Sequence, residues 1–123
     1  MPFILSTARI KPGKTPQLRA WYEEVERRRE EALETQRAEG VRQEHAFILP
    51  GDDFDLLAVF VEVEDMDKAN EAFFASPFKI DAEHLAAMDE CTEGGGAGRI
   101  YADLVFSSAG PLADVAHNVS SRS

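Results

Sequence analysis

The chain has 123 residues and a mass of 13.6 kDa, which suits a single domain. Its 13 basic and 23 acidic side chains give a formal net charge of −10, and an acidic surface of this size repels nucleic acid. One cysteine excludes an internal disulfide, and no apolar run approaches the roughly 18–20 residues that a membrane span needs. We therefore expect a cytoplasmic globular protein that binds neither nucleic acid nor membranes.

The first 40 residues predict a strand followed by a long helix. Residues 3–10 are mostly apolar and end at a Lys-Pro-Gly turn, as a short strand does. Thr15 is the expected N-cap of a helix over residues 16–39, and Pro16 fits its first position. Apolar residues recur in this helix at spacings of three and four, which predicts one buried stripe: Leu18, Trp21, Tyr22, Val25, Ala32 and Leu33.

The middle of the chain predicts a β-hairpin and a second helix. Residues 41–49 and 54–63 are rich in β-branched and aromatic side chains, and a Pro-Gly-Asp-Asp turn joins them. Asp65 or Asp67 is expected to cap the helix that follows. A Ser-Pro pair at 76–77 should end that helix, because the residue before a proline avoids the helical conformation.

A short helix and a last strand complete the predicted domain. Asp81 is the expected N-cap of a helix that starts at Ala82, and a glycine-rich link leads to a strand at 99–106. The order β-α-β-β-α-β is that of the ferredoxin-like α+β fold. It predicts a four-stranded antiparallel sheet, in the order 4-1-3-2, over residues 1–106. Residues 107–123 are expected to form a flexible C-terminal tail or a docking arm.

Alternation along the strands gives the predicted sheet two different faces. One face is wholly apolar and should lie under the helices: Leu57, Val59, Val61, Val63, Ile100, Ala102, Leu104 and Phe106. The other face mixes large apolar groups with charges: Phe3, Leu5, Thr7, Arg9, Leu56, Ala58, Phe60, Glu62, Arg99, Tyr101, Asp103 and Val105. The mixed face is too apolar for water and too polar for a core. A second copy of the chain that covers it and leaves a wet chamber would make a homodimer.

Segments 9–14 and 78–84, with the charged helix around Trp21, resemble the dimeric α/β-barrel superfamily over about residues 3–106. In that superfamily two ferredoxin-like chains pack sheet to sheet. Within it, the chain is similar to a family of small bacterial proteins of unknown function. The superfamily includes cofactor-free monooxygenases, haem-degrading enzymes, lactone isomerases, polyketide cyclases and proteins with no known reaction, so the fold does not select the function.

His84 and Tyr101 are the catalytic candidates. As the third residue of the predicted short helix, His84 would face the positive end of the helix dipole, which lowers its pKa and leaves a neutral base. The stretch resembles, in position, the histidine-bearing loop of olivetolic-acid-type polyketide cyclases, which implies a histidine base beside a tyrosine. Those proteins carry a His-Pro-x-His pattern, whereas here His84 follows Pro77 by seven residues. The alternative is an exposed histidine at a helix start.

Four further residues are candidates for binding the substrate: Arg9, Arg99, Asp103 and Phe60. Because neighbouring strands run antiparallel, Arg9 should lie near Arg99 and Tyr101, and His84 enters from the same end. Two arginines there suit a carboxylate or an enolate. The alternative is that these arginines pair with Asp103, with Glu62 or with the partner chain.

The sequence does not assign a single role to three other polar residues, Glu44, Glu62 and His45. Glu44 and Glu62 should lie with Arg42 at the opposite mouth of the chamber, either as a general acid or as an ion network at the dimer rim. His45 is expected on the face of Val41, Phe47 and Leu49, as a structural histidine packed near the helices.

The leading functional hypothesis is a cofactor-independent enzyme for an aromatic or polyketide-like carbonyl or carboxylate compound. Cyclisation, isomerisation and oxygenation all stay open, with His84 as base, Tyr101 as hydrogen-bond donor and Arg9 as anion anchor. The alternative is a non-catalytic dimeric module that binds a ligand or serves in stress. A third hypothesis is haem binding through His84 or His45. No cofactor is expected under the leading hypothesis, and no spacing of His, Cys and carboxylates indicates a metal site.

Overall fold

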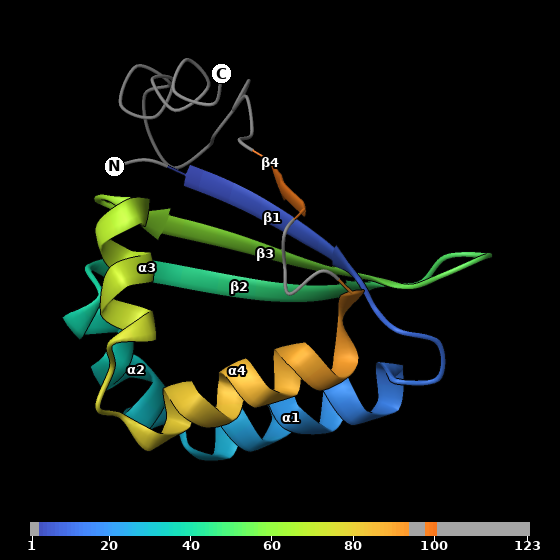
Figure 1. Cartoon of the computed structure of the whole chain (residues 1–123), viewed down its shortest axis with the longest axis horizontal. Coiled ribbons are helices and arrows are strands. Elements are labelled where there is room, and N and C mark those ends of the chain that lie inside the picture. Colours follow the sequence, from blue (N-terminus) through green and yellow to red (C-terminus); the bar gives the residue numbers. More distant parts are fainter. Residues whose placement is uncertain (1–2, 94–97, 101–123) are drawn as a thin grey trace.

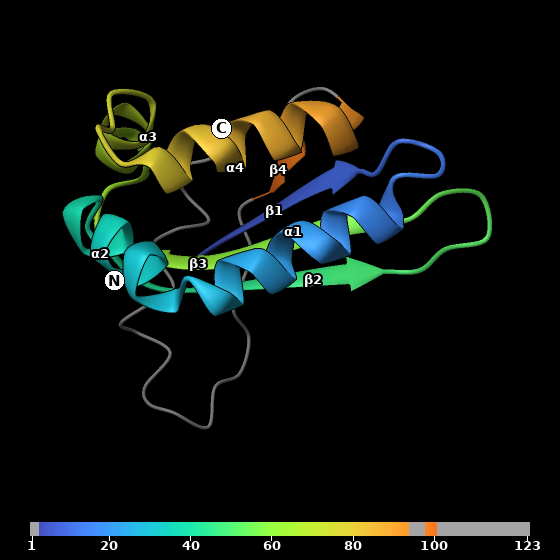
Figure 2. The same ribbon diagram turned by 90° about the horizontal axis from the view of Figure 1, so that it is seen from below.

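All four helices lie on one side of an antiparallel sheet in this computed structural model, which describes residues 3–93 and 98–100 (Figures 1 and 2). This arrangement confirms the predicted α+β class. None of the described helices is long and apolar enough to cross a bilayer. The elements follow in the order β1 (Phe3–Arg9), α1 (Thr15–Arg27), α2 (Arg29–Ala38), β2 (Val41–Leu49), β3 (Leu56–Val63), α3 (Met66–Phe74), α4 (Lys79–Cys91) and β4 (Gly98–Ile100).

Strand β3 lies between β1 and β2 and runs antiparallel to both. The three-residue strand β4 pairs with the other edge of β1, where Leu5 faces Ile100, so the order is β2-β3-β1-β4. The predicted last strand extended to residue 106, and its residues 101–106 lie outside the described ones, as does the predicted tail at 107–123. The ferredoxin-like assignment, which needs that whole strand, stays a prediction.

Two apolar clusters hold the helices against the sheet. In the first, Ala69 of α3 packs on a group of strand residues, namely Ile4, Val41, Val61 and Val63. In the second, Leu18 of α1 and Cys91 of α4 meet Ile10 and Leu57, and Leu18 is fully buried. The prediction that the Leu57–Val63 face of β3 lies under the helices is therefore confirmed.

The predicted helix over 16–39 is two helices, because the chain leaves the helical conformation at Arg28 (φ −105°, ψ 38°). Residues 26–31 are all charged, so this stretch offers no apolar side chain to the buried stripe. Arg28 instead pairs with Glu31 at 2.9 Å and reaches Glu83 of α4 at 2.7 Å. Thr15 is the first residue of α1 rather than its N-cap, and its hydroxyl donates to Asp55.

Helix α4 starts three residues earlier than predicted, and Asp81 is not its N-cap. Phe78 holds the N-cap position, and its amide donates to the Ser76 hydroxyl at 3.0 Å. Asp81 lies inside the helix, buried against the hydroxyl of Thr35 in α2. His84 is consequently the sixth residue of α4 and not the third, so it lies beyond the first turn, where the helix dipole acts.

A β-bulge in β2 reverses the predicted faces of that strand. The register with β3 shifts between Val41 and Gln43, which leaves one extra residue in β2. Because side chains alternate along a strand, every later residue changes sides. Glu44 therefore lines the helix side, while His45 lies opposite Phe60 on the open side and is exposed. The expectation that His45 packs near the helices is wrong for this reason.

Candidate functional site

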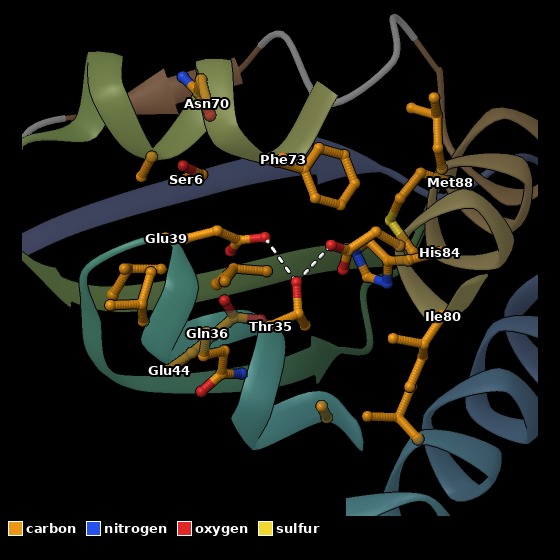
Figure 3. A pocket seen from close by; sticks show the side chains of 18 of the residues that line it. Ser6, Thr35, Gln36, Glu39, Glu44, Asn70, Phe73, Ile80, His84 and Met88 are labelled. Carbon is orange, nitrogen blue, oxygen red and sulfur yellow. Dashed lines mark hydrogen bonds between the residues drawn. The ribbon is translucent and has the colours of Figure 1, made fainter. Parts of the chain in front are cut away.

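A pocket of about 290 Å³ lies between the helices and the sheet (Figure 3). Its apolar walls include Trp21, Tyr22, Val59, Val61, Phe73 and Met88. Its polar lining includes Ser6, Thr35, Gln36, Glu39, Glu44, Asn70, Asp81 and His84. Within the part of the chain that the structure describes, no lysine or arginine lines it. A cavity of roughly 150 Å³ can hold benzene, so this pocket has room for a one-ring compound with a polar substituent.

The imidazole of His84 is held by aromatic side chains. The rings of Trp21, Tyr22 and Phe73 lie 5.9, 6.1 and 6.0 Å from it, and Trp21 Nε1 donates a hydrogen bond of 2.9 Å to His84 Nδ1. An indole N–H can only donate, so Nδ1 must be unprotonated. Burial lowers the pKa of His84 to about 4, although the charge of Asp81 opposes the shift. At neutral pH the ring is therefore uncharged, with its proton on Nε2.

This geometry changes the role expected for His84. The sequence predicted a lowered pKa, and that direction is confirmed, but the cause is burial and not the helix dipole. A neutral ring whose Nδ1 already accepts from Trp21 presents an N–H group at Nε2. His84 is thus equipped as a hydrogen-bond donor rather than as the base that the sequence predicted.

Two carboxyl groups share the hydroxyl of Thr35 (Figure 3). Thr35 Oγ1 lies 3.1 Å from Glu39 Oε2 and also bonds to Asp81 Oδ2. One hydroxyl carries one proton, so it donates to one carboxylate, and the second contact requires a protonated carboxyl. Burial, strengthened by the charge of Asp81, raises the pKa of Glu39 to about 7. Glu39 is therefore a group that can both hold and release a proton near neutral pH.

Glu44 enters the same pocket from β2. Burial raises its pKa, and the charge of Asp81 adds to the effect. Within the described part of the chain its carboxyl forms no hydrogen bond or ion pair. The charge of Glu44 contributes to raising the pKa of Tyr22, after burial of that phenol, so the Tyr22 hydroxyl keeps its proton. Glu44 was expected beside Glu62 and Arg42, but only Glu62 and Arg42 lie together, 3.8 Å apart. Glu62 lies on the open face, where Gln43 also donates to it at 2.8 Å.

The other candidates from the sequence do not join His84. Arg9 lies over the ring of Phe54, 3.7 Å from its centre, and Phe60 stacks on Phe3. Both lie on the face of the sheet opposite the pocket, so the expected convergence of Arg9 with His84 is not found. Arg99 belongs to β4, with its backbone opposite Ser6, and Tyr101 and Asp103 lie outside the described residues.

Sequence reasoning missed three residues of the site, Thr35, Glu39 and Asp81. Thr35 and Glu39 are four residues apart on one helix, which is a weak signal that they share a face. Their partner Asp81 comes 46 residues after Thr35, and no pattern in the sequence links the two. Across residues 3–93 and 98–100, no group of three or more His, Cys, Asp and Glu is arranged to hold a metal ion.

These features define a small α+β protein with a helix-covered antiparallel sheet and a carboxyl-rich pocket under its helices. The chain belongs to the family of unknown function DUF6176, whose family model matches residues 1–107. The match includes every residue that lines the pocket. The predicted membership in a family of unknown function is thus confirmed. No similar curated protein and no similar solved structure was found.

Proposed function

We propose that the pocket is the active site of a cofactor-independent enzyme that moves a proton on a small aromatic or polyketide-like carbonyl compound. The hydrogen bond from Trp21 to His84 carries this proposal, because it fixes the ring as an N–H donor. Such a donor suits a carbonyl oxygen that gains negative charge during reaction. The ferredoxin-like, dimeric α/β-barrel assignment is part of the same proposal, and the side of the sheet that the helices cover is consistent with it.

The proposed step is enolisation. Ionised Glu39 takes a proton from the carbon next to the carbonyl group, and the C–H electron pair moves to the carbonyl oxygen, which accepts from His84 Nε2–H. A pKa of about 7 makes Glu39 both a competent base and a competent acid at neutral pH. Where a double bond is conjugated with the enolate, return of the proton from Glu39 to the far carbon gives isomerisation. Attack of the enolate carbon on a second carbonyl forms a C–C bond and an alkoxide, and the alkoxide takes the proton from Glu39, which gives cyclisation. Oxygenation, the third reaction type expected from the sequence, is not part of this proposal.

The charge of the pocket limits the class of substrate that it can bind. Among the described residues, three that carry a carboxyl group line it, and no lysine or arginine does. A carboxylate substrate, expected when Arg9 was the anchor, would meet like charge here.

The second candidate function is a non-catalytic binding module, and the bond between Trp21 and His84 also favours it, because the bond fixes a wall of the pocket. The third hypothesis, haem binding, needs a histidine that faces the proposed dimer chamber, and His45 lies on that open face of the sheet.

The enzymatic proposal predicts deuterium exchange into a simple ketone. With acetophenone in D₂O at neutral pH, the protein should replace the methyl hydrogens by deuterium about a hundredfold faster than buffer does, as measured by the decay of the proton NMR signal. Glu39→Gln should abolish the acceleration, because the amide cannot take the proton. Glu64→Gln, which alters an exposed residue after β3, is the matched control and should keep it. If ligand-observed NMR shows acetophenone bound and the exchange stays at the buffer rate, the binding module replaces the enzyme.

We also propose a homodimer through the open face of the sheet. The bulge in β2 adds Phe47 and Leu49 to this face, and these side chains are 52% and 46% exposed. The stacked pair Phe3 and Phe60 lies on the same face. Large apolar side chains gathered on one exposed face of a sheet are uncommon on a monomer and are normally covered.

A second copy on this face should bury on the order of 2,000 Å² in total, as stable dimers do. Sedimentation at low micromolar concentration should then give twice the 13.6 kDa mass of the chain. Phe47→Glu should give monomers, because it places a charge in the interface. Phe74→Glu makes the same change at a 69% exposed site on α3 and should leave the dimer intact. A compact 13.6 kDa species of the unmodified chain contradicts the proposal.

A further inference from the structure

We infer that the natural ligand of the pocket carries a positively charged amine on a ring-sized apolar body, and that Glu44 receives this amine. The inference rests on the proposed function, because it names the substrate class of the same site. It starts from the one carboxyl group of the pocket that is left without a hydrogen-bond partner in the described structure.

Glu44 differs from the other two carboxyl groups of the pocket. Glu39 and Asp81 are bridged by the Thr35 hydroxyl, whereas Glu44 has no hydrogen bond or ion pair within the described residues. Its side chain is half-buried and lines the pocket. A half-buried carboxyl group that no group of the described protein pairs is open to a ligand that enters the pocket, and their contact strengthens as the ligand displaces water.

The titratable groups around Glu44 indicate the charge of that ligand. Tyr22 of α1, Glu39 of α2, and Asp81 and His84 of α4 face the pocket, and none of them is a cation at neutral pH. Arg28, at the break between α1 and α2, is engaged by Glu31 and Glu83. An ammonium group therefore completes the charge balance of the site, and an anionic ligand worsens it.

The apolar walls suit the same ligand. The rings of Trp21, Tyr22 and Phe73 gather around His84 at one side of the pocket. Aromatic faces attract organic cations, most strongly where water is excluded, and tryptophan is the best of them. Rings and a carboxylate in one cavity form the combination that recognises an amine on an apolar body.

The test compares three probes that share one ring and differ in charge: benzylamine, benzyl alcohol and benzoate. Trp21 is the only tryptophan of the chain and lines the pocket, so its fluorescence reports binding directly. At neutral pH we expect benzylamine to bind at least about tenfold more tightly than benzyl alcohol, which is the lower range of a desolvated cation–π and ion-pair contact. Benzoate should bind least.

Two variants assign the effect to Glu44. Glu44→Gln should reduce benzylamine binding to the level of benzyl alcohol and leave benzyl alcohol itself unchanged. Glu64→Gln removes the same charge at an exposed position and should keep the preference. Benzyl alcohol binding as well as benzylamine, or an amine preference that survives Glu44→Gln, overturns the inference and leaves the pocket as a small-molecule site. No binding of any probe overturns the proposed function itself.

Discussion

Replacing His84 by asparagine is expected to remove stability that the protein gains between about pH 4 and pH 6.5. Burial lowers the pKa of His84 to about 4 in the folded chain, whereas a free imidazole titrates near 6.5. Between these values the unfolded chain binds a proton that the folded chain does not, so the free energy of unfolding rises with pH. The side-chain oxygen of asparagine can still accept the Trp21 N–H, which keeps the variant folded.

The expected size of this effect is about 2–3 kcal/mol, since each pKa unit corresponds to roughly 1.4 kcal/mol and the ring is only partly enclosed. The quantity to measure is the difference in free energy of unfolding between the unmodified chain and His84→Asn. Urea titrations at several pH values between 4 and 7, followed by Trp21 fluorescence, give this difference. It should grow with pH over that range. A difference that stays constant contradicts a buried, neutral His84.

Replacing Glu39 by glutamine should change the free energy of unfolding with the opposite pH dependence, so this variant serves as the comparison. Burial, with the charge of Asp81, raises the pKa of Glu39 to about 7 in the folded chain. The folded chain therefore binds a proton that the unfolded chain releases, and this part of the stability is lost as the pH rises from about 4.5 to 7. The difference between the unmodified chain and Glu39→Gln should thus shrink with pH, opposite in sign to the effect of His84→Asn.

The elements that local signals define could be predicted from the sequence. Strand β2 has the predicted range Val41–Leu49, and α3 starts after Asp65, whose carboxylate accepts the Lys68 amide at 3.2 Å. The apolar alternation of β3 correctly assigned the face that the helices cover. In each case the residues that decide the structure are neighbours in the chain.

The rest of the site depends on contacts that the sequence does not encode locally. The bulge near Arg42 has no turn residue to mark it, yet it moves Glu44 into the pocket and His45 out of it. The helix breaks at Arg28, where the sequence has no apolar residues. Helical spacing of apolar residues on both sides of this stretch led us to predict one continuous helix. Asp81 does not cap α4, because its carboxyl group bonds to the Thr35 hydroxyl, and the helix starts earlier, at Lys79. His84 was singled out for its chemistry, but its proton could be placed only once Trp21 was seen beside it.

The proton on the His84 ring is the feature on which the proposed chemistry most directly depends. A two-bond proton–nitrogen NMR correlation spectrum of the imidazoles distinguishes the two neutral forms and follows the titration. His84→Asn assigns the signal among the three histidines of the chain. We expect the proton on Nε2, an unprotonated Nδ1 and a titration midpoint at about 4. A proton on Nδ1, or a midpoint at or above 6.5, contradicts a neutral His84 that donates from Nε2 into the pocket.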